Sequence, residues 1–195
     1  MAFIWGGSRT IVSRPYTCGF CGNSLASNIG YVAGLNGGNH VQRHIYICHF
    51  CDKPTYIDEG GTQTPGAAFG NAVSKIESVE VAKLYEEARN CMKVNAFTAA
   101  SLCCRKLLMN IAVAKGAEQG LSFAQYVDFF DTKGITPKDS KEWVEHIRNK
   151  GNEATHEISS ISREDAEDLI NFSEMLLKII YEFPSRVRTK NAKTT

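Results

Sequence analysis

The spacing of apolar residues changes along the chain, from short runs in the first part to a helical period in the second. In residues 1–60 the apolar runs are broken by Gly and Asn, which is typical of small β-hairpins. Residues 41–47 alternate as a strand, and the Asn36-Gly37 dipeptide before it tolerates positive φ, so a hairpin turn is expected there. One face of this strand carries Val41, Ile45 and Ile47, and the other carries Gln42, His44 and Tyr46.

From about Ser78 onward the apolar residues recur at the period of an amphipathic helix. Thr136 and Ser162 each place a hydroxyl before an acidic first turn, which is a helix-start signal. Pro184 is expected to end the last helix, because Pro has no backbone N–H to donate. The pattern predicts five helices with short connections, and therefore an up-and-down bundle. They start near Ser78, after Asn95, at Leu121, at Thr136 and at Ser162.

Four of the seven cysteines form two CxxC pairs, Cys18 with Cys21 and Cys48 with Cys51. A two-residue spacer lets a tight turn aim two thiolates at one point, as tetrahedral coordination at about 2.3 Å requires. We therefore predict one structural Zn²⁺ held by all four cysteines. Such a site has no open position for water, so the metal is not expected to be catalytic.

Other interpretations of the N-terminal residues fit the sequence less well than this site. A redox CxxC motif would open a helix in a βαβ context, which is missing here. His49 lies inside the second pair and could replace a cysteine, but four thiols already complete the site. Phe20, Tyr46 and Phe50 could form a platform on which bases stack, or the core of this small module.

The composition narrows the possible partners. With 43% apolar and 22% charged residues and a net charge of +1, the 195-residue chain is neither disordered nor a strong polyelectrolyte. Any nucleic-acid surface must be a local patch. Arginines and lysines nearly balance the acids in residues 1–60, which argues against sequence-specific DNA binding.

The same composition bears on location and domain plan. No apolar stretch approaches the roughly 20 residues that span a bilayer, so we expect no membrane and a cytoplasmic protein. Cys91, Cys103 and Cys104 fall in a helical pattern and are expected to be reduced core thiols. The predicted fold is α+β. Its parts are a β zinc ribbon (1–60), a linker rich in Gly, Thr and Ala (61–76), a helical bundle (77–185) and a basic tail (186–195).

Several motifs of the second part resemble a known family. Tyr85-Glu86-Glu87-Ala88, Arg105, Trp143 and the segment IRNKGNEATH look like domain-of-unknown-function family 4145, which is similar to the HEPN superfamily of helical bundles. Many HEPN proteins are metal-independent ribonucleases that act as dimers through paired Arg and His motifs. The resemblance therefore implies that His156 acts as general acid or base, that Arg148 braces the phosphate and that Asn149 positions it.

One spacing departs from that pattern. Seven residues separate Arg148 from His156, one more than the superfamily motif contains, while Lys150 stands at a permitted distance without being Arg. Either a bulge at Gly151-Asn152 restores the geometry, or the segment serves packing and capping alone.

Two functions remain open from the sequence. The first is a zinc-binding interaction or regulatory module in prokaryotic phage–host or mobile-element conflict, with a protein or RNA partner. The alternative is a metal-independent endoribonuclease acting as a dimer. Phe172, Met175 and Ile179 lie outside the main inner stripe of the last helix, and this second apolar face predicts a homodimer.

Overall fold

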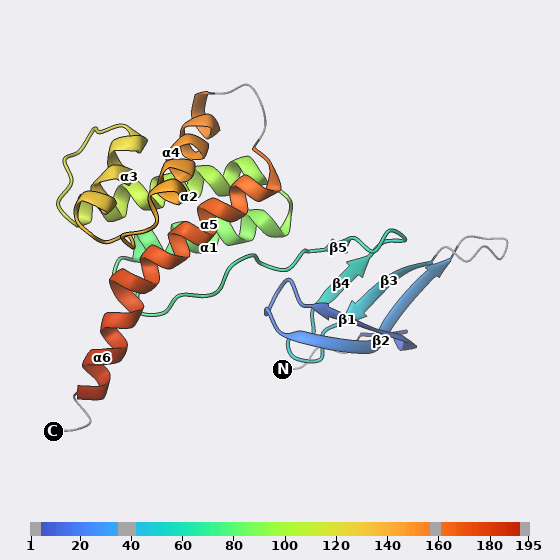
Figure 1. The fold of residues 1–195 in the computed structure, drawn as a ribbon. Coiled ribbons are helices and arrows are strands. Elements are labelled where there is room, and N and C mark those ends of the chain that lie inside the picture. The colour runs from blue at the N-terminus through green and yellow to red at the C-terminus, as the bar shows by residue number, and fades with distance from the viewer. Residues whose placement is uncertain (1–4, 35–41, 157–160, 192–195) are drawn as a thin grey trace. The chain divides into compact units, whose positions relative to one another are not determined.

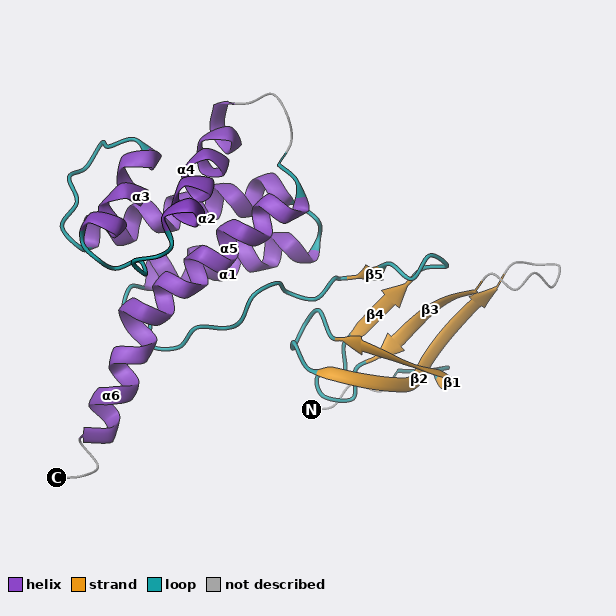
Figure 2. Ribbon diagram, viewed as in Figure 1, coloured by secondary structure: helices purple, strands orange, loops and turns teal. Residues whose placement is uncertain are grey.

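The computed structural model describes residues 5–34, 42–156 and 161–191, and the chain divides into two compact units. We call Met1–Ala68 the ribbon unit and Phe69–Thr195 the helical unit. Strands occur in the first and helices in the second, so the α+β fold class is confirmed (Figure 2). The boundary falls inside the stretch 61–76 that the sequence predicts as a linker.

The described residues of the ribbon unit form one antiparallel sheet of five strands (Figure 1). Each strand pairs with the next strand in the sequence, so the order is β1-β2-β3-β4-β5. The strands are β1 (Arg9–Thr17), β2 (Ser24–Gly34), β3 (Gln42–Ile47), β4 (Pro54–Ile57) and β5 (Gln63–Thr64).

A small core gathers around Tyr46 of β3. Its ring is 2% exposed and lies 5.9 Å, centroid to centroid, from that of Tyr16. Gly30 of β2 pairs with Tyr46, and a Cβ there would collide with the carbonyl oxygen of Ile45, so the close approach of the two strands requires glycine. Cys18, Leu25, Cys48 and Ile57 belong to the same core.

Burial along β3 does not follow the alternation of its aliphatic residues. Ile47 is buried, but Ile45 of the same face is 36% exposed, whereas Tyr46, from the face shared with Gln42 and His44, is buried. Tyr46 has the larger apolar surface, and its hydroxyl is satisfied by donating to the carbonyl oxygen of Val12 at 3.0 Å. Val41 and the predicted Asn36-Gly37 turn lie outside the described residues.

The described part of the helical unit contains the five predicted helices, with the last one extended. α2 packs against α1, α3, α4 and α5 and is the central helix. α2 has the length and hydropathy of a membrane span, but it buries residues from Ala100 to Ala112 inside the bundle. The elements are α1 (Val79–Lys93), α2 (Phe97–Ala114), α3 (Phe123–Thr132), α4 (Lys141–His156), α5 (Arg163–Leu177), a π-helical segment (Lys178–Glu182) and α6 (Phe183–Asn191).

The predicted start at Ser162 is confirmed, and the one at Thr136 is wrong. The Ser162 hydroxyl accepts a hydrogen bond from the Asp165 amide at 3.1 Å. Thr136 instead is buried and donates to Asp131 at 3.1 Å, so it closes α3 rather than starting α4. α4 begins at Lys141, after a turn in which the Ser140 hydroxyl donates to the carbonyl oxygen of Pro137 at 2.6 Å.

Two further expectations about helix ends are corrected. The polar composition of residues 148–156 is typical of a connection between helices, but these residues belong to α4, which runs to His156. Pro184 does not end the last helix, because it falls in the first turn of α6, where a missing N–H is tolerated after the π segment.

The predicted second apolar face of the last helix is partly internal. Phe172 is 0% exposed, and its ring meets that of Trp143 edge-on with centroids 5.1 Å apart. Met175 packs against the same core. Phe172 therefore needs no partner chain to cover it.

Candidate metal centre

Each CxxC pair forms the turn of a β-hairpin, between β1 and β2 and between β3 and β4. The Cys18 amide donates to Asn23 at 2.9 Å, and the Cys48 amide donates to Lys53 at 3.0 Å. In return, the amides of Gly22 and Asp52 donate to the carbonyl oxygens of the first cysteines, at 2.8 Å each. Gly22 (φ +74°) and Asp52 (φ +57°) both adopt the left-handed conformation that this turn requires. The two knuckles thus repeat one backbone design.

The two hairpin turns bring the four predicted cysteines together. All four Sγ atoms lie within 4.8 Å of one another. The Sγ atoms of Cys18 and Cys51 are 3.7 Å apart, as are those of Cys21 and Cys48. Tetrahedral coordination at about 2.3 Å puts ligand sulfurs roughly 3.8 Å apart, so the thiols are spaced for a metal ion and not for disulfides.

The thiols differ in how readily they lose a proton. Burial raises the pKa of Cys48 and, with its neighbouring thiols, raises that of Cys51 to about 12. Burial also acts on Cys21, but hydrogen bonds from Asn23 outweigh it and lower its pKa to about 7. A bound cation would replace the protons, so metal binding would release them.

Two contacts around the knuckles were missed from the sequence. A Cβ on Gly19 would lie 2.6 Å from the carbonyl oxygen of Pro65, so the residues after β5 can lie against the first knuckle only because position 19 is glycine. The indole N–H of Trp5 donates to the carbonyl oxygen of Asp52 at 2.9 Å, beside the second knuckle. Gly19, between Cys18 and Cys21, was the signal in the sequence that could have indicated the contact with Pro65.

The aromatic residues of the ribbon unit differ in how far they are exposed. Tyr46 is core, whereas Phe20 and Phe50, each inside one knuckle, are 44% and 59% exposed. His49 lies outside the cysteine cluster, with its ring 4.5 Å from that of Phe50. Lys53 Nζ lies 5.0 Å from the centre of the Phe20 ring.

The residues implied as catalytic lie along α4. Arg148 Nε is 3.3 Å from a carboxylate oxygen of Asp128 on α3, and Asn149 is exposed. His156 is the last residue of α4, and its side chain lies outside the described part of the chain. At 1.5 Å per residue, Arg148 and His156 are separated by roughly 12 Å along the helix axis.

A hydrogen bond and an ion pair connect α4 to α5. His146 Nε2 lies 2.9 Å from Asp168, and Lys150 Nζ lies 3.2 Å from Asp165. Together with Arg148 and Asp128, they attach successive turns of α4 to its neighbours.

Comparison with known proteins identifies the helical unit. A family model described as a domain of unknown function, DUF4145, matches residues 86–193. The chain belongs to the DUF4145 family. The match begins inside α1 and includes α2 to α6, so the ribbon unit lies outside it. No curated protein and no solved structure matches the chain.

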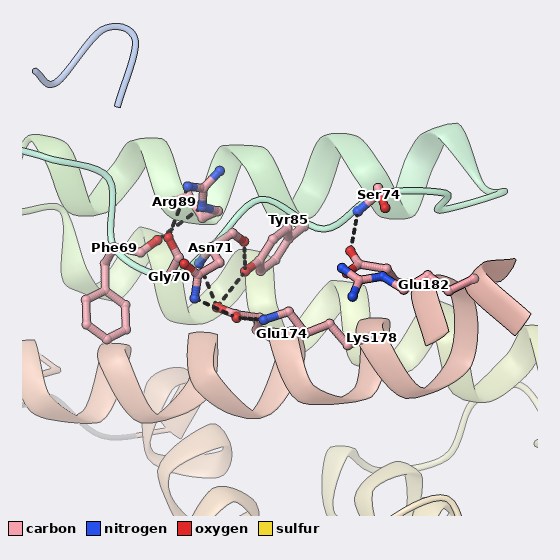
Figure 3. Close-up of polar contacts among 10 residues, drawn as sticks. Phe69, Gly70, Asn71, Ser74, Tyr85, Arg89, Glu174, Lys178 and Glu182 are labelled. Atoms are coloured by element: carbon pink, nitrogen blue, oxygen red, sulfur yellow. Dashed lines mark hydrogen bonds and ion pairs between the residues drawn. The ribbon is translucent and has the colours of Figure 1, made fainter. Parts of the chain in front are cut away.

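A partly buried polar network attaches the first residues of the helical unit to the DUF4145 helices (Figure 3). Glu174 of α5 accepts hydrogen bonds from the Asn71 amide at 2.7 Å and from Asn71 Nδ2 at 2.9 Å, and it also contacts Lys178. The Tyr85 hydroxyl donates to the carbonyl oxygen of Asn71 at 2.8 Å. The Arg89 guanidinium donates to the carbonyl oxygens of Phe69 and Gly70, at 3.1 Å each. Part of the predicted linker is therefore fixed on this unit.

Proposed function

We propose that this DUF4145 protein is an interaction module whose ribbon unit, stapled by one structural Zn²⁺, presents a protein-binding surface. The exposure of Phe20 and Phe50 is the observation that carries the proposal. Each lies inside a knuckle whose backbone is tied by paired hydrogen bonds, so both rings stand on rigid supports. Large aromatic side chains on a rigid surface are typical of the residues that dominate protein–protein binding.

The choice of zinc follows from the ligand set. Four thiolates in a tetrahedral arrangement suit zinc or iron, and two CxxC hairpins are typical of zinc ribbons. A closed set of four protein ligands supports a structural role, because no position remains for a substrate or an activated water.

The contacts of α4 support a non-enzymatic role. Arg148 and Lys150, the two cations available to brace a phosphate, lie against Asp128 and Asp165. A phosphate would have to compete with those carboxylates for the same charge. The resemblance to the HEPN superfamily is what supports a setting in phage–host or mobile-element conflict.

The test is partner binding by the full-length protein. Phe50→Ser should abolish co-purification of the partner from the native host, while Val12→Ser should not, because Val12 is also exposed (78%) but lies on β1 away from the knuckles. Zinc content should stay at one per chain in both variants. Equal partner recovery with both variants would overturn the proposed surface.

A parallel assay tests the ribonuclease alternative. We expect no cleavage of single-stranded RNA in the absence of divalent metal. Cleavage that leaves 2′,3′-cyclic phosphate ends and is lost in His156→Ala would establish the endoribonuclease instead, since removal of a proton-transfer group costs about 10²–10⁴-fold in rate.

A further inference from the structure

A pocket of about 360 Å³ lies at the base of α6, and neither the four cysteines nor any residue of α4 lines it. One wall is the segment 75–77 that precedes α1. The other wall is formed by the π segment and α6, through residues that include Ile180, Tyr181 and Arg188. Its volume falls in the lower part of the range for small-molecule sites.

The first wall is held in a strained conformation. Lys75 has φ +63°, a left-handed conformation that is rare for a residue with a Cβ. Both of its flanks are anchored: the Ser74 amide donates to Glu182 at 2.8 Å (Figure 3), and the Ser78 hydroxyl caps α1 by accepting from the Val81 amide at 3.3 Å. Backbone strain that the surrounding contacts maintain is characteristic of ligand sites.

The second wall carries another unusual backbone feature. Ile180 and Tyr181 belong to the π segment, a distortion that is frequent at functional sites. The π turn and α6 together place Tyr181, Ser185 and Arg188 on the pocket lining.

The pocket has an excess of positive charge. Lys75 and Arg188 line it, and Lys115 Nζ lies 5.5 Å from the centre of the Tyr181 ring. Among the described residues of the lining, Glu77 is the one carboxylate. The neighbouring Arg186, by contrast, is bonded to Glu182 at 2.6 Å.

The remaining lining is apolar. Ile76, Ile180 and Pro184 add hydrocarbon surface to the lining. A free inorganic anion would leave this surface wet, whereas an anion with an apolar body would cover it.

From these features we infer that the pocket binds a small organic anion, an apolar body that bears one phosphate or carboxylate group. The anionic group lies between Lys75 and Arg188, where a guanidinium can donate two parallel hydrogen bonds. The body covers Ile76 and Ile180. Glu77 disfavours a second anionic group on the same ligand.

Isothermal titration calorimetry of the full-length protein tests this site with model compounds. Phenyl phosphate or phenylacetate should bind saturably at one per chain, and the tighter of the two identifies the head group. Lys75→Asn and Arg188→Gln should each weaken that binding about tenfold or more, because a charge-assisted contact is lost. Asn tolerates positive φ, so the first variant keeps the backbone conformation.

Matched controls separate this site from general attraction to basic residues. Lys138→Asn, at an exposed lysine before α4, should leave affinity unchanged. Inorganic phosphate and benzyl alcohol should each bind at least tenfold more weakly than the better aromatic anion, since each lacks one half of the ligand. The inference is overturned if neither anion saturates up to about 10 mM, far weaker than specific binding. It is also overturned if both pocket variants bind like the parent, or if inorganic phosphate binds equally well.

Discussion

In the ribbon unit the buried core gathers around Tyr46 and includes Cys18 and Cys48 of the metal centre, whereas the helical unit buries whole helix faces around Leu107 and Phe130. The core of the ribbon unit is too small to stabilise a domain by apolar burial alone, as is usual for units as short as Met1–Ala68. The core of the helical unit contains the fully buried Phe172 and Leu176 and needs no cofactor to account for its stability. The two units therefore differ in what can stabilise them: apolar burial in the helical unit, and in the ribbon unit four thiols spaced for a metal ion.

The largest expected effect is the loss of the metal. A strong chelator, or Cys48→Ser with Cys51→Ser, should unfold the ribbon unit and leave the helical unit folded. The apparent binding free energy of structural zinc, about 10–16 kcal/mol near pH 7, is then lost from the ribbon unit alone. NMR spectra should lose the dispersed signals of β1 to β5 while helical circular dichroism persists.

The matched control for metal loss is Cys91→Ser. Cys91 is a half-buried thiol of α1 outside the cluster, so this variant should keep one zinc per chain. A ribbon unit that stays folded without metal would break the comparison.

A core truncation in the helical unit should destabilise that unit and leave the ribbon unit unaffected. Leu107→Ala removes a fully buried side chain of α2 and should lower the free energy of unfolding of this unit by about 2–5 kcal/mol. Zinc content should not change. Leu102→Ala on the same helix is the control, because Leu102 is 41% exposed and should cost about 0.5 kcal/mol or less. Chemical denaturation of both variants measures the difference.

The polar network should contribute less than the core. Glu174→Ala removes the acceptor for the Asn71 amide and leaves Lys178 without this carboxylate, so we expect a loss of about 1–3 kcal/mol. Glu86→Ala, at an exposed carboxylate bonded to Arg89, should cost less in the same denaturation experiment. Equal losses would show that the buried network adds nothing beyond surface pairing.

The Glu174 carboxylate should make the stability of the helical unit depend on pH. Burial opposes its ionisation, but hydrogen bonds from Lys178 and Asn71 outweigh burial and lower the pKa of Glu174. A lowered folded pKa adds stability above the unfolded value, about 4.3, and that stability is lost as pH falls through the folded value. The stability difference between the parent and Glu174→Gln should therefore shrink from about pH 5 downward. A constant difference would contradict this.

The smallest effect is expected at the start of α5. Ser162→Ala removes the cap on the Asp165 amide and should cost about 1 kcal/mol. Ser162→Asp should restore most of it, because a carboxylate caps the same amide and favours the helix dipole. Thermal unfolding of both variants distinguishes a cap from general sensitivity at this position.

The parts of the fold that were predictable depend on short-range signals. Two CxxC spacings, the change from strand-like to helical periodicity and the cap at Ser162 each involve residues within a few positions of one another. The four cysteines were predicted as one cluster because each knuckle is a local turn, and the structure brings both turns to one point. Gly19 and Trp5 were missed, since their partners lie far away in the sequence.

Tertiary contacts decided the remainder. α4 continues to His156 although its last residues have the polar composition of a connection. Its side-chain contacts with Asp128, Asp165 and Asp168 attach it to α3 and α5. Phe172 is internal because Trp143 covers it.

The sequence by itself thus determined the α+β class, the two cysteine knuckles and most helix positions, because hydrogen-bonding and burial periods are local properties of the chain. It did not determine which face of β3 is buried, whether Pro184 stops a helix, or that Glu174 and Glu182 fix residues 71 and 74. Those outcomes depend on which distant group supplies the missing contact. Only the folded chain brings such groups together.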